Sequence, residues 1–424
     1  MILVTRRIPG DAQYNGGPVK RRFVNTVAAV AAVSLFAAGC ADNGSGGGDS
    51  VGEGDTIKVG LMYDVTGPAA AGSVGTDTGA KARIDTINAA GGINGRKLEL
   101  VIGDSASTPA GAQSAAKTLV EQHGVFAVMT WTYTANAAAP YLEQQKVPVI
   151  GGSWDSAPQW AHGENFFGTQ PANTEASVVT TYGNWFKQAG VTKAASIGLN
   201  TASGKTAAEK VAESIRSAGI DVPLVNTSID QTTADFGPTA IAVKNSGVDG
   251  LYVALAPNGI YALAAALKQQ NVNVKLAMAG TGYGQDLLDN PSARQGADGM
   301  QFVMHYQPKE LNTDATKAMV TALEGQGFTG SPGFAVAGGY TDVDLFAHGL
   351  RLAGDDVTRE NFISKLRDDT SWNGEGLMAG TASFPEFVPA GPGLNYGNCM
   401  YVSELRGESF VPVVDTPYCG DNIG

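Results

Sequence analysis

The sequence predicts an α/β protein of two lobes, each built on a parallel sheet with helices on both faces. From residue 56 onward, short apolar runs alternate with longer amphipathic runs, and this order is typical of parallel sheets with helical connections. The 424 residues, 43% of them hydrophobic, can form large cores and are too many for one ordinary domain. The 56 glycines, many in turn-like clusters, fit a fold with many short connections.

Individual elements follow from the same alternation. The first strand is expected at 57–62, and the first helix at 78–90, where Ala80, Ile84 and Ile87 share one face before Gly91 and Gly92 end the helix. Further strands are expected at 97–102, 126–129, 147–150, 194–199, 250–254 and 275–279. Further helices are expected at 110–122, 134–145, 207–218 and 261–270. So many strands exceed one compact sheet, which favours two lobes.

Residues 1–40 have the features of an export signal. A basic cluster at 20–22 precedes an apolar run at 27–38, which is long enough for a signal peptide and too short for a membrane span. Small residues then lead into Cys40, and this segment resembles a bacterial lipobox. We expect Cys40 to be lipid-modified and to become the first residue of the mature chain. The alternative is an ordinary secretory signal followed by a chance cysteine.

The segment after Cys40 reads as a flexible tether. Residues 41–55 are rich in glycine and serine, and such a linker reaches on the order of 20 Å. The expected location is therefore extracytoplasmic, at the outer face of the cell membrane. Outside the cytoplasm a cysteine pair tends to oxidise, so we predict a disulfide between Cys399 and Cys419 that closes the last hairpin. It would contribute roughly 3 kcal/mol in the loop-entropy description.

Several function classes are disfavoured by composition and spacing. The net charge is −12, with 28 Lys and Arg against 40 Asp and Glu, and without a basic cluster a nucleic-acid partner is not expected. The glycine clusters at 198–206 and 280–284 lack the spacing of nucleotide-binding loops. The histidines show no metal-ligand spacing and no nucleophile elbow is present. We therefore expect no cofactor, no metal and no catalytic residue, with an exported hydrolase as a minor alternative.

A spaced set of motifs gives a specific resemblance. Within the first 65 or so residues after the linker stand Thr66-Gly67-Pro68, Asn88 to Gly95, Asp104, Ser107-Thr108-Pro109 and Ala112. Together they resemble the start of the leucine/isoleucine/valine-binding protein family, and weaker similarity continues almost to the C-terminus. The resemblance implies a solute-binding protein that captures a small molecule and passes it to the permease of an ABC importer. A sensor that docks on a receptor is the alternative.

The resemblance also implies a type I periplasmic-binding fold, in which two doubly wound lobes are joined by three hinge crossovers. We place the crossovers near 168–171, 304–306 and 384–389. Lobe 1 is then expected to contain 56–170 plus 306–386, and lobe 2 to contain 171–305 plus 387–424. We expect a monomer that meets the membrane only through its lipid anchor.

The first expected ligand contacts lie in the polar loop Thr130 to Thr134. Free backbone N–H groups at a helix N-terminus favour an anion. Thr132 stands where the family has a serine that binds the ligand carboxylate, so the resemblance implies the same role for Thr132. The simpler alternative is that Thr132 caps the helix. Tyr133 follows it and is also expected at the site.

The loop after the 147–150 strand supplies the next expected contacts. Ser153, Trp154 and Asp155 stand at family positions that touch the ligand, although Asp155 replaces a threonine and Trp154 a smaller residue. Trp131, Tyr133 and Trp154 near one cleft would stack on a flat ligand. For Trp154, packing in the core is the alternative.

In lobe 2 the chain departs from the pattern of branched-chain amino-acid binding. The resemblance aligns Thr281 with a glutamate that holds the ligand ammonium, and it aligns Asn258 and Ser203 with tyrosine-bearing positions. Losing a hydrogen bond to a charged group costs about 1.5–3 kcal/mol, although Asp155 can compensate from the other lobe. We therefore expect an amino acid-like or other small carboxylate-bearing ligand, including aromatic acids, rather than leucine, isoleucine or valine.

Overall fold

The computed structural model describes residues 52, 56–170, 178–382, 384 and 398–423. The expected signal at 1–40, its Cys40, nearly all of the linker at 41–55 and most of the expected third crossover lie outside these residues. Residues 46–424 form one compact unit, which is described by itself below. Within its described part, no helix combines the length and the apolar character needed to cross a bilayer.

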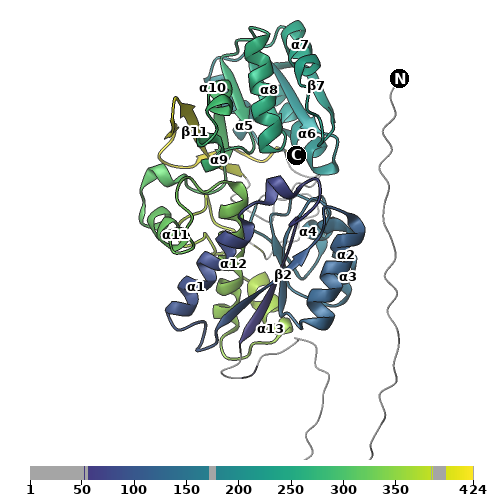
Figure 1. Ribbon diagram of the computed structural model, residues 1–424, viewed down its shortest axis with the longest axis vertical. Helices are drawn as coiled ribbons and strands as arrows, with labels where there is room; N and C mark the ends of the chain where they lie inside the picture. The colour runs from purple at the N-terminus through teal and green to yellow at the C-terminus, as the bar shows by residue number, and fades with distance from the viewer. Residues whose placement is uncertain (1–51, 53–55, 171–177, 383, 385–397, 424) are drawn as a thin grey trace, which may run out of the picture. The chain divides into compact units, whose positions relative to one another are not determined.

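The first sheet has five parallel strands in the order β2-β1-β3-β4-β5 (Figure 1). The strands are β1 Ile57–Tyr63, β2 Leu98–Asp104, β3 Ala127–Trp131, β4 Val149–Gly151 and β5 Phe166–Gly168. Helices α1 Thr76–Ala89 and α12 Phe334–Ala353 cover one face, and α2 Pro109–Lys117 and α3 Ala139–Gln144 cover the other. Apolar side chains alternate between the two faces, as Leu61 and Met62 show, so both faces carry a buried core.

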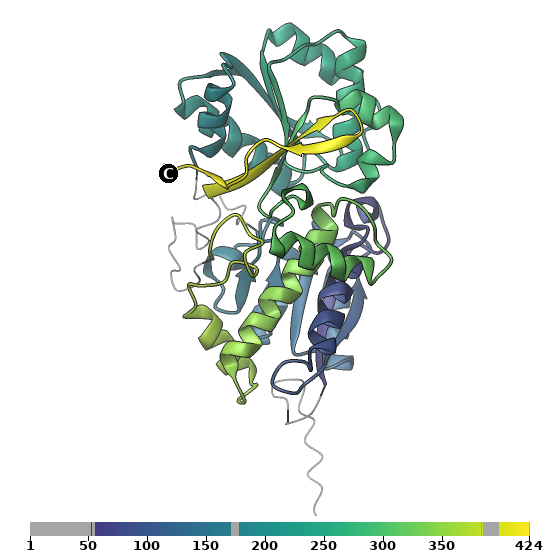
Figure 2. The ribbon, with the colours of Figure 1, turned by 90° about the vertical axis from the view of Figure 1, so that its left-hand side faces the viewer.

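The second sheet has eight strands and is mixed. Five parallel strands come first along the chain: β6 Lys193–Leu199, β7 Asp221–Ile229, β8 Gly250–Ala254, β9 Leu276–Ala279 and β10 Gln301–Met304. The C-terminal strands β11 Cys399–Arg406, β12 Ser409–Pro412 and β13 Tyr418–Cys419 join antiparallel beside β10, as the yellow ribbon in Figure 2 shows. Helices α5 Thr181–Gln188 and α6 Ala202–Ser217 cover one face, and α7 Gly237–Ser246, α8 Pro257–Gln269 and α10 Pro291–Ala297 the other.

The chain changes sheets after β5, after β10 and before β11. Between β10 and β11 it adds α11 Asp314–Glu324, α12 and α13 Arg359–Arg367, which pack on α1 and on the first sheet. The short helices α4 Gln159–His162 and α9 Gln285–Leu288 follow strands of the first and second sheet, respectively. The predicted fold class, α/β with two doubly wound lobes, is confirmed.

The expected elements are present with shifted ends. The expected helix at 134–145 is reduced to a 3-10 turn at Ala135–Ala137 and the short α3, in whose first turn Pro140 stands. Helix α6 begins five residues before its expected start, because the Thr201 side chain accepts a hydrogen bond from the Gly204 amide and caps it. Strand β7 was not expected, since Pro223 and the polar residues 226–228 hide its apolar pattern.

The C-terminal tail is fastened to the second lobe. The Cys399–Cys419 disulfide is confirmed and joins β11 to β13. Beyond it, the Thr180 amide donates to the Asp421 carbonyl over 2.8 Å, and the Ile423 amide donates to the Val178 carbonyl over 2.8 Å. The last residues therefore lie against the segment by which the chain enters the second lobe.

Helices α1 and α12 cross in close contact, as Figure 2 also shows. A Cβ at Gly79 would lie 1.9 Å from the Val336 carbonyl oxygen, and a Cβ at Gly339 would lie 1.9 Å from the Thr76 carbonyl oxygen. Beside this crossing Arg83 forms a buried ion pair with Asp344, and the Trp372 indole N–H donates to the same carboxylate over 2.8 Å. Two glycines thus let the helix backbones meet, and a paired charge fixes their register.

Gly79→Ala is expected to lower the free energy of unfolding by about 1–3 kcal/mol or more, because the two backbones must separate to admit a methyl group. Chemical denaturation followed by circular dichroism measures the change. The matched control is Gly72→Ala, where a Cβ meets no atom within 4 Å. Equal stability of Gly79→Ala and wild type would contradict the close crossing.

A buried carboxyl group is hydrogen-bonded to the segment in which the chain first leaves one sheet for the other. Asp342 on α12 is fully buried, and its Oδ1 accepts a hydrogen bond from the Thr169 hydroxyl over 2.5 Å, just after β5. Burial raises the pKa of Asp342 to about 8. The folded protein therefore keeps this carboxyl neutral near pH 7, whereas the unfolded chain has lost the proton by about pH 4.

The raised pKa of Asp342 predicts a loss of stability in mildly alkaline solution. The folded protein binds the Asp342 proton more tightly than the unfolded chain does. The stability that this proton contributes is complete below pH 4 and is lost as the pH rises through 8. Between pH 7 and 9 the melting temperature of the wild type should decline, and that of Asp342→Asn should stay nearly level. Differential scanning calorimetry is the measurement. Asp230→Asn, which removes an exposed carboxylate, should keep the wild-type slope; equal slopes in all three proteins would refute the role of Asp342.

Candidate functional site

The loops after the first two strands hold one another in place. The carboxylate of Asp104 accepts from the backbone amides of Val65 and Thr66 and, over 2.6 Å, from the Thr66 hydroxyl. The Ser107 hydroxyl donates to the Thr66 carbonyl, and Gly67 takes a positive φ of 94° where a Cβ would lie 2.4 Å from the Ala106 carbonyl oxygen. The motifs around Thr66, Asp104 and Ser107 therefore form a single hydrogen-bonded cluster at the carboxyl ends of β1 and β2, whereas Asn88 bonds to the Leu98 backbone at the start of β2.

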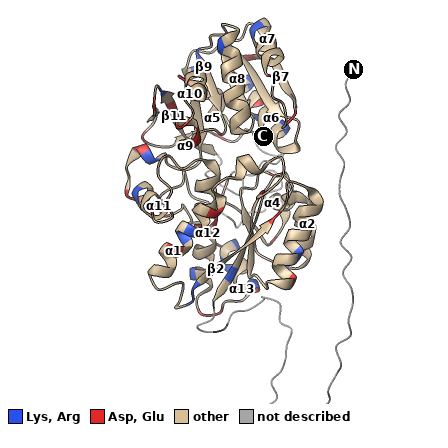
Figure 3. Ribbon diagram, in the orientation of Figure 1, with Lys and Arg blue, Asp and Glu red and all other residues tan. Residues whose placement is uncertain are grey.

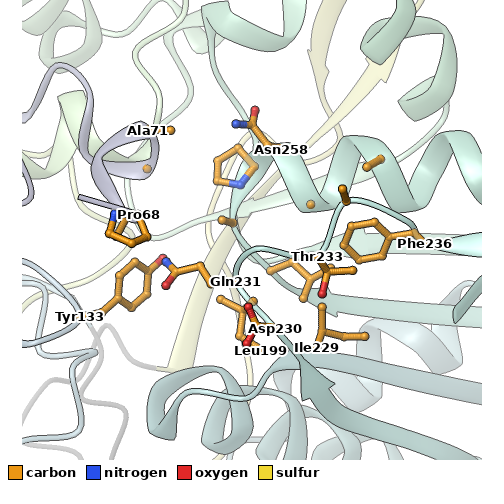
Figure 4. A pocket seen from close by; sticks show the side chains of 18 of the residues that line it. Pro68, Ala71, Tyr133, Leu199, Ile229, Asp230, Gln231, Thr233, Phe236 and Asn258 are labelled. Carbon is orange, nitrogen blue, oxygen red and sulfur yellow. The ribbon is translucent and has the colours of Figure 1, made fainter. Parts of the chain in front are cut away.

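Next to this cluster lies a cavity of about 280 Å³. Pro68, Ala69, Ala71, Gly72 and Tyr133 line it from the first lobe. Figure 4 shows Pro68 and Tyr133 at its left and Ile229, Thr233 and Phe236 at its right. In the second lobe, Ala262 of α8 and Asp286 of α9 line the cavity. The other second-lobe lining residues end or follow strands β6, β7 and β8, and they are Leu199, Ile229, Asp230, Gln231, Thr233, Ala234, Phe236, Leu255, Ala256, Pro257, Asn258 and Gly259. The cavity thus lies where open α/β sheets hold their ligands.

Of the two residues expected in the first polar loop, only Tyr133 lines the cavity. Burial and the negative charge of Asp64 raise the pKa of Tyr133 to about 12, so its phenol is neutral at physiological pH. Thr132 is 1% exposed, and its hydroxyl donates to Asp64 Oδ1 over 2.6 Å. The Thr132 oxygen also accepts from the Thr134 amide over 3.2 Å, which is a local turn contact rather than a cap of a long helix.

The three residues expected after β4 do not line the described cavity. The Ser153 hydroxyl donates to the Gln170 carbonyl over 2.5 Å. Asp155 is 5% exposed and accepts from the Ala157 amide and the Trp160 indole N–H, while burial raises the pKa of Asp155 to about 6. None of the three is among the residues that line the cavity.

The aromatic residues contact one another. The Trp154 ring lies edge-on to Tyr133, with centroids 4.7 Å apart, and to Trp131, with centroids 5.6 Å apart. Trp131 is buried against Gly338 of α12 and Phe334. Stacking on a flat ligand is therefore open only to Tyr133 among these rings in the described cavity.

Of the three residues expected from the second lobe, one lines the cavity and two do not. Asn258, in the first turn of α8, is exposed and lines the cavity. Thr281 is not among the lining residues, but its hydroxyl donates over 2.9 Å to the carbonyl of Leu255, which is one of them. Ser203 lies in the first turn of α6, outside the lining.

Several lining residues were not anticipated. Asp230, Gln231 and Thr233 follow β7, a strand that the sequence pattern does not predict, so the loop after it was not predicted to line a site. Phe236 closes the same loop and is buried. Their position in the fold would have identified them as cavity residues, because each follows the carboxyl end of a parallel strand, as Tyr133 and Asn258 do.

The cavity wall combines acidic, uncharged polar and apolar residues. Among its described lining residues there is no Lys, Arg or His, and the charged members are Asp230 and Asp286. Leu199, Ile229 and Leu255 supply buried apolar surface. Elsewhere Lys and Arg are interspersed with Asp and Glu along the ribbon (Figure 3). No group of three His, Cys, Asp or Glu side chains in the described part of the chain is arranged to hold a metal ion.

Comparisons with known proteins give relatives of one kind. The chain is 25% identical over 311 residues to Leu/Ile/Val-binding protein homolog 1 of Brucella abortus, covering 72% of this chain and 80% of the relative. It is 26% identical over 320 residues to the leucine-, isoleucine-, valine-, threonine- and alanine-binding protein of Pseudomonas aeruginosa, covering 74% and 83%. These relatives are binding proteins and are not named as enzymes.

Solved structures share the fold. An ABC transporter solute-binding protein of R. palustris in complex with benzoate superposes with a TM-score of 0.70 at 19% identity, covering 86% of this chain and 98% of the other. A leucine-binding protein of Thermotoga maritima gives 0.68 at 16% identity, covering 85% and 98%. The model of a family described as periplasmic binding protein matches residues 56–408. The chain therefore belongs to the periplasmic binding protein family.

Proposed function

We propose that this chain is the extracytoplasmic solute-binding component of an ABC importer. The observation that carries the proposal is the cavity of about 280 Å³, lined from both lobes by residues at the carboxyl ends of parallel strands. Ligand pockets of proteins have volumes of roughly 300–1,000 Å³, so a cavity just below this range fits a solute the size of an amino acid.

The proposed mechanism is capture by closure. Tyr133 and Pro68 contact the solute from the first lobe, and Phe236 and Asn258 contact it from the second. Because both sets of contacts exist only in the closed form, the solute shifts the lobes toward closure. The closed protein then docks on the permease and releases the solute to it.

The proposed ligand is amino acid-like, with an amino group and an apolar body. The acidic wall formed with Asp230 and Asp286, and the apolar surface of Leu199, Ile229 and Leu255, support this class over a simple aromatic carboxylate. Two named relatives bind branched-chain amino acids or are homologues of such proteins. In this chain, however, the expected position of the ammonium-binding glutamate is Thr281, whose hydroxyl already donates to the Leu255 carbonyl.

A ligand panel tests the proposal. Purified protein should be stabilised by one class of amino acid-like solutes in a thermal-shift screen without turnover of the solute, because a ligand that binds only the folded state raises its stability. Leucine itself should bind weakly or not at all in calorimetric titration. A dissociation constant of about 1 μM for leucine, about −8 kcal/mol, would contradict the expected ligand class. A complete absence of shifts across amino acids, amines and small carboxylic acids would contradict the solute-binding function.

Anchoring at the outer face of the membrane is part of the proposal and is tested separately. In the producing cell, the wild-type protein should incorporate radiolabelled palmitate and fractionate with membranes, since Cys40 is the expected lipid acceptor. Cys40→Ala should lose the label and appear in the soluble fraction. Cys419→Ser is the control, because it removes a cysteine of the disulfide and should keep both the label and the membrane location. Label on Cys40→Ala would contradict the anchor.

A further inference from the structure

The second lobe supplies the large aliphatic side chains of the cavity. Leu199 ends β6, Ile229 ends β7 and Leu255 follows β8, and these strands are neighbours in the sheet order β8-β6-β7. These three side chains and the ring of Phe236 are at most 6% exposed. Together the four residues form what we call the apolar end of the cavity.

Phe236 bounds this apolar end. Figure 4 shows its ring on the side of the cavity away from Pro68 and Tyr133. Phe236 is the residue just before α7, and the tip of its ring faces α8, because a Cβ at Gly259 would lie 3.4 Å from Phe236 Cζ. The ring therefore stands between the cavity and α8, and it limits how far a solute can extend in this direction.

Helix α8 presents its smallest residues to the cavity. Gly259 and Ala262 both line it and are three positions apart, so they share one face of the helix. Glycine lowers helix stability relative to alanine, so a glycine in the first turn of α8 calls for a physical reason.

Packing and backbone conformation do not supply that reason for Gly259. It is not among the glycines with positive φ. A Cβ there would meet Phe236 at 3.4 Å and Leu255 at 3.5 Å, which is ordinary van der Waals contact rather than a clash. The missing methyl group instead leaves room between two side chains that line the apolar end.

Hydrogen-bonding groups lie at the other side of the cavity. Figure 4 shows Tyr133 of the first lobe and Gln231 of the second on the side opposite Phe236. A phenol and a side-chain amide can each donate and accept hydrogen bonds. The polar head of a solute is therefore accommodated at Tyr133 and Gln231, with its apolar part directed toward Phe236.

We propose that Phe236 and Gly259 determine the specificity of this site by setting the longest aliphatic group that a solute can place in the apolar end. The recognised class is then an amino acid-like molecule with an aliphatic side chain of limited length. The inference rests on the proposed solute-binding function and adds the residues that select among solutes.

A chain-length series tests the inference on the purified protein. The probes are alanine, 2-aminobutyrate, norvaline, norleucine, 2-aminoheptanoate and 2-aminooctanoate, which share one head group and differ by single methylene groups. Calorimetric titration at millimolar concentrations should give affinities that rise about three- to fourfold for each buried methylene up to a limiting length. The next longer member should bind about tenfold more weakly, because extra methylenes in a filled pocket force strain.

Two variants should move this limit in opposite directions. Gly259→Ala adds a methyl group to the apolar end and should weaken the longest accepted member about tenfold, while alanine keeps its affinity within about twofold. Phe236→Ala removes the ring and should tighten the first excluded member about tenfold relative to wild type, because the vacated volume accepts the longer chain. A general structural defect would instead weaken all members alike.

Phe328→Ala is the matched control for the loss of a ring. Phe328 follows α11, packs against the apolar core and lies outside the cavity lining. Its replacement should lower the stability of the protein and keep the wild-type limit of chain length. Should Phe236→Ala fail to fold, Gly259→Ala decides alone, because it removes no packed atom.

The remaining outcomes decide against the inference. An unchanged limit in Gly259→Ala, or an equal loss of affinity for alanine and for the longest member, would overturn it while leaving the solute-binding function intact. Failure of the whole series to bind wild-type protein would also overturn it, and the wider ligand panel would then judge the proposed function independently.

Discussion

Parallel strands end on one edge of a sheet, and this constraint determines where the chain can place polar groups without breaking its cores. In the first lobe, Asp64, Ser105 and Thr132 follow three adjacent strands and satisfy one another there. In the second lobe, the residues after β6, β7 and β8 form the opposite wall of the cavity. Apolar strand interiors provide stability, and the short segments just beyond them provide recognition.

Competition for hydrogen-bond donors connects the loops to the function. Asp104 consumes the amides of Val65 and Thr66, which makes the first loop rigid, and Asp64 consumes the hydroxyl protons of Ser105 and Thr132. The groups that the site offers to a solute are those that do not already form hydrogen bonds within the protein. In this chain the cavity offers the Tyr133 ring and the carboxylates of Asp230 and Asp286, and this set differs from the anion site that the resemblance implies.

Most of the parallel strands and the helices between them could be predicted because strand and helix periods are local properties of the sequence, whereas β5, β10 and the helices between β10 and β11 were not among the expected elements. Strand β7 was not predicted because Pro223 and three consecutive polar residues mask the alternation of apolar and polar side chains. The cavity-lining residues that follow β7 were therefore not predicted either. Tyr133 and Asn258 could be predicted because the family resemblance places the ligand contacts in loops that follow expected strands. The partner of Thr132 could not be chosen, since the contact with Asp64 depends on the spatial order β2-β1-β3, which the chain order does not reveal.

The tail beyond β13 has a mechanical consequence. The residues near Asp421 and Ile423 bond to Val178 and Thr180, and the Thr181 hydroxyl bonds to the Asn398 carbonyl, so an entering segment, a returning segment and the chain end form one clasp. Hydrogen bonds therefore hold the chain end to both of these segments. A purification handle fused at the C-terminus would extend directly from this clasp, whereas one placed in the segment 41–55 would not be attached to it.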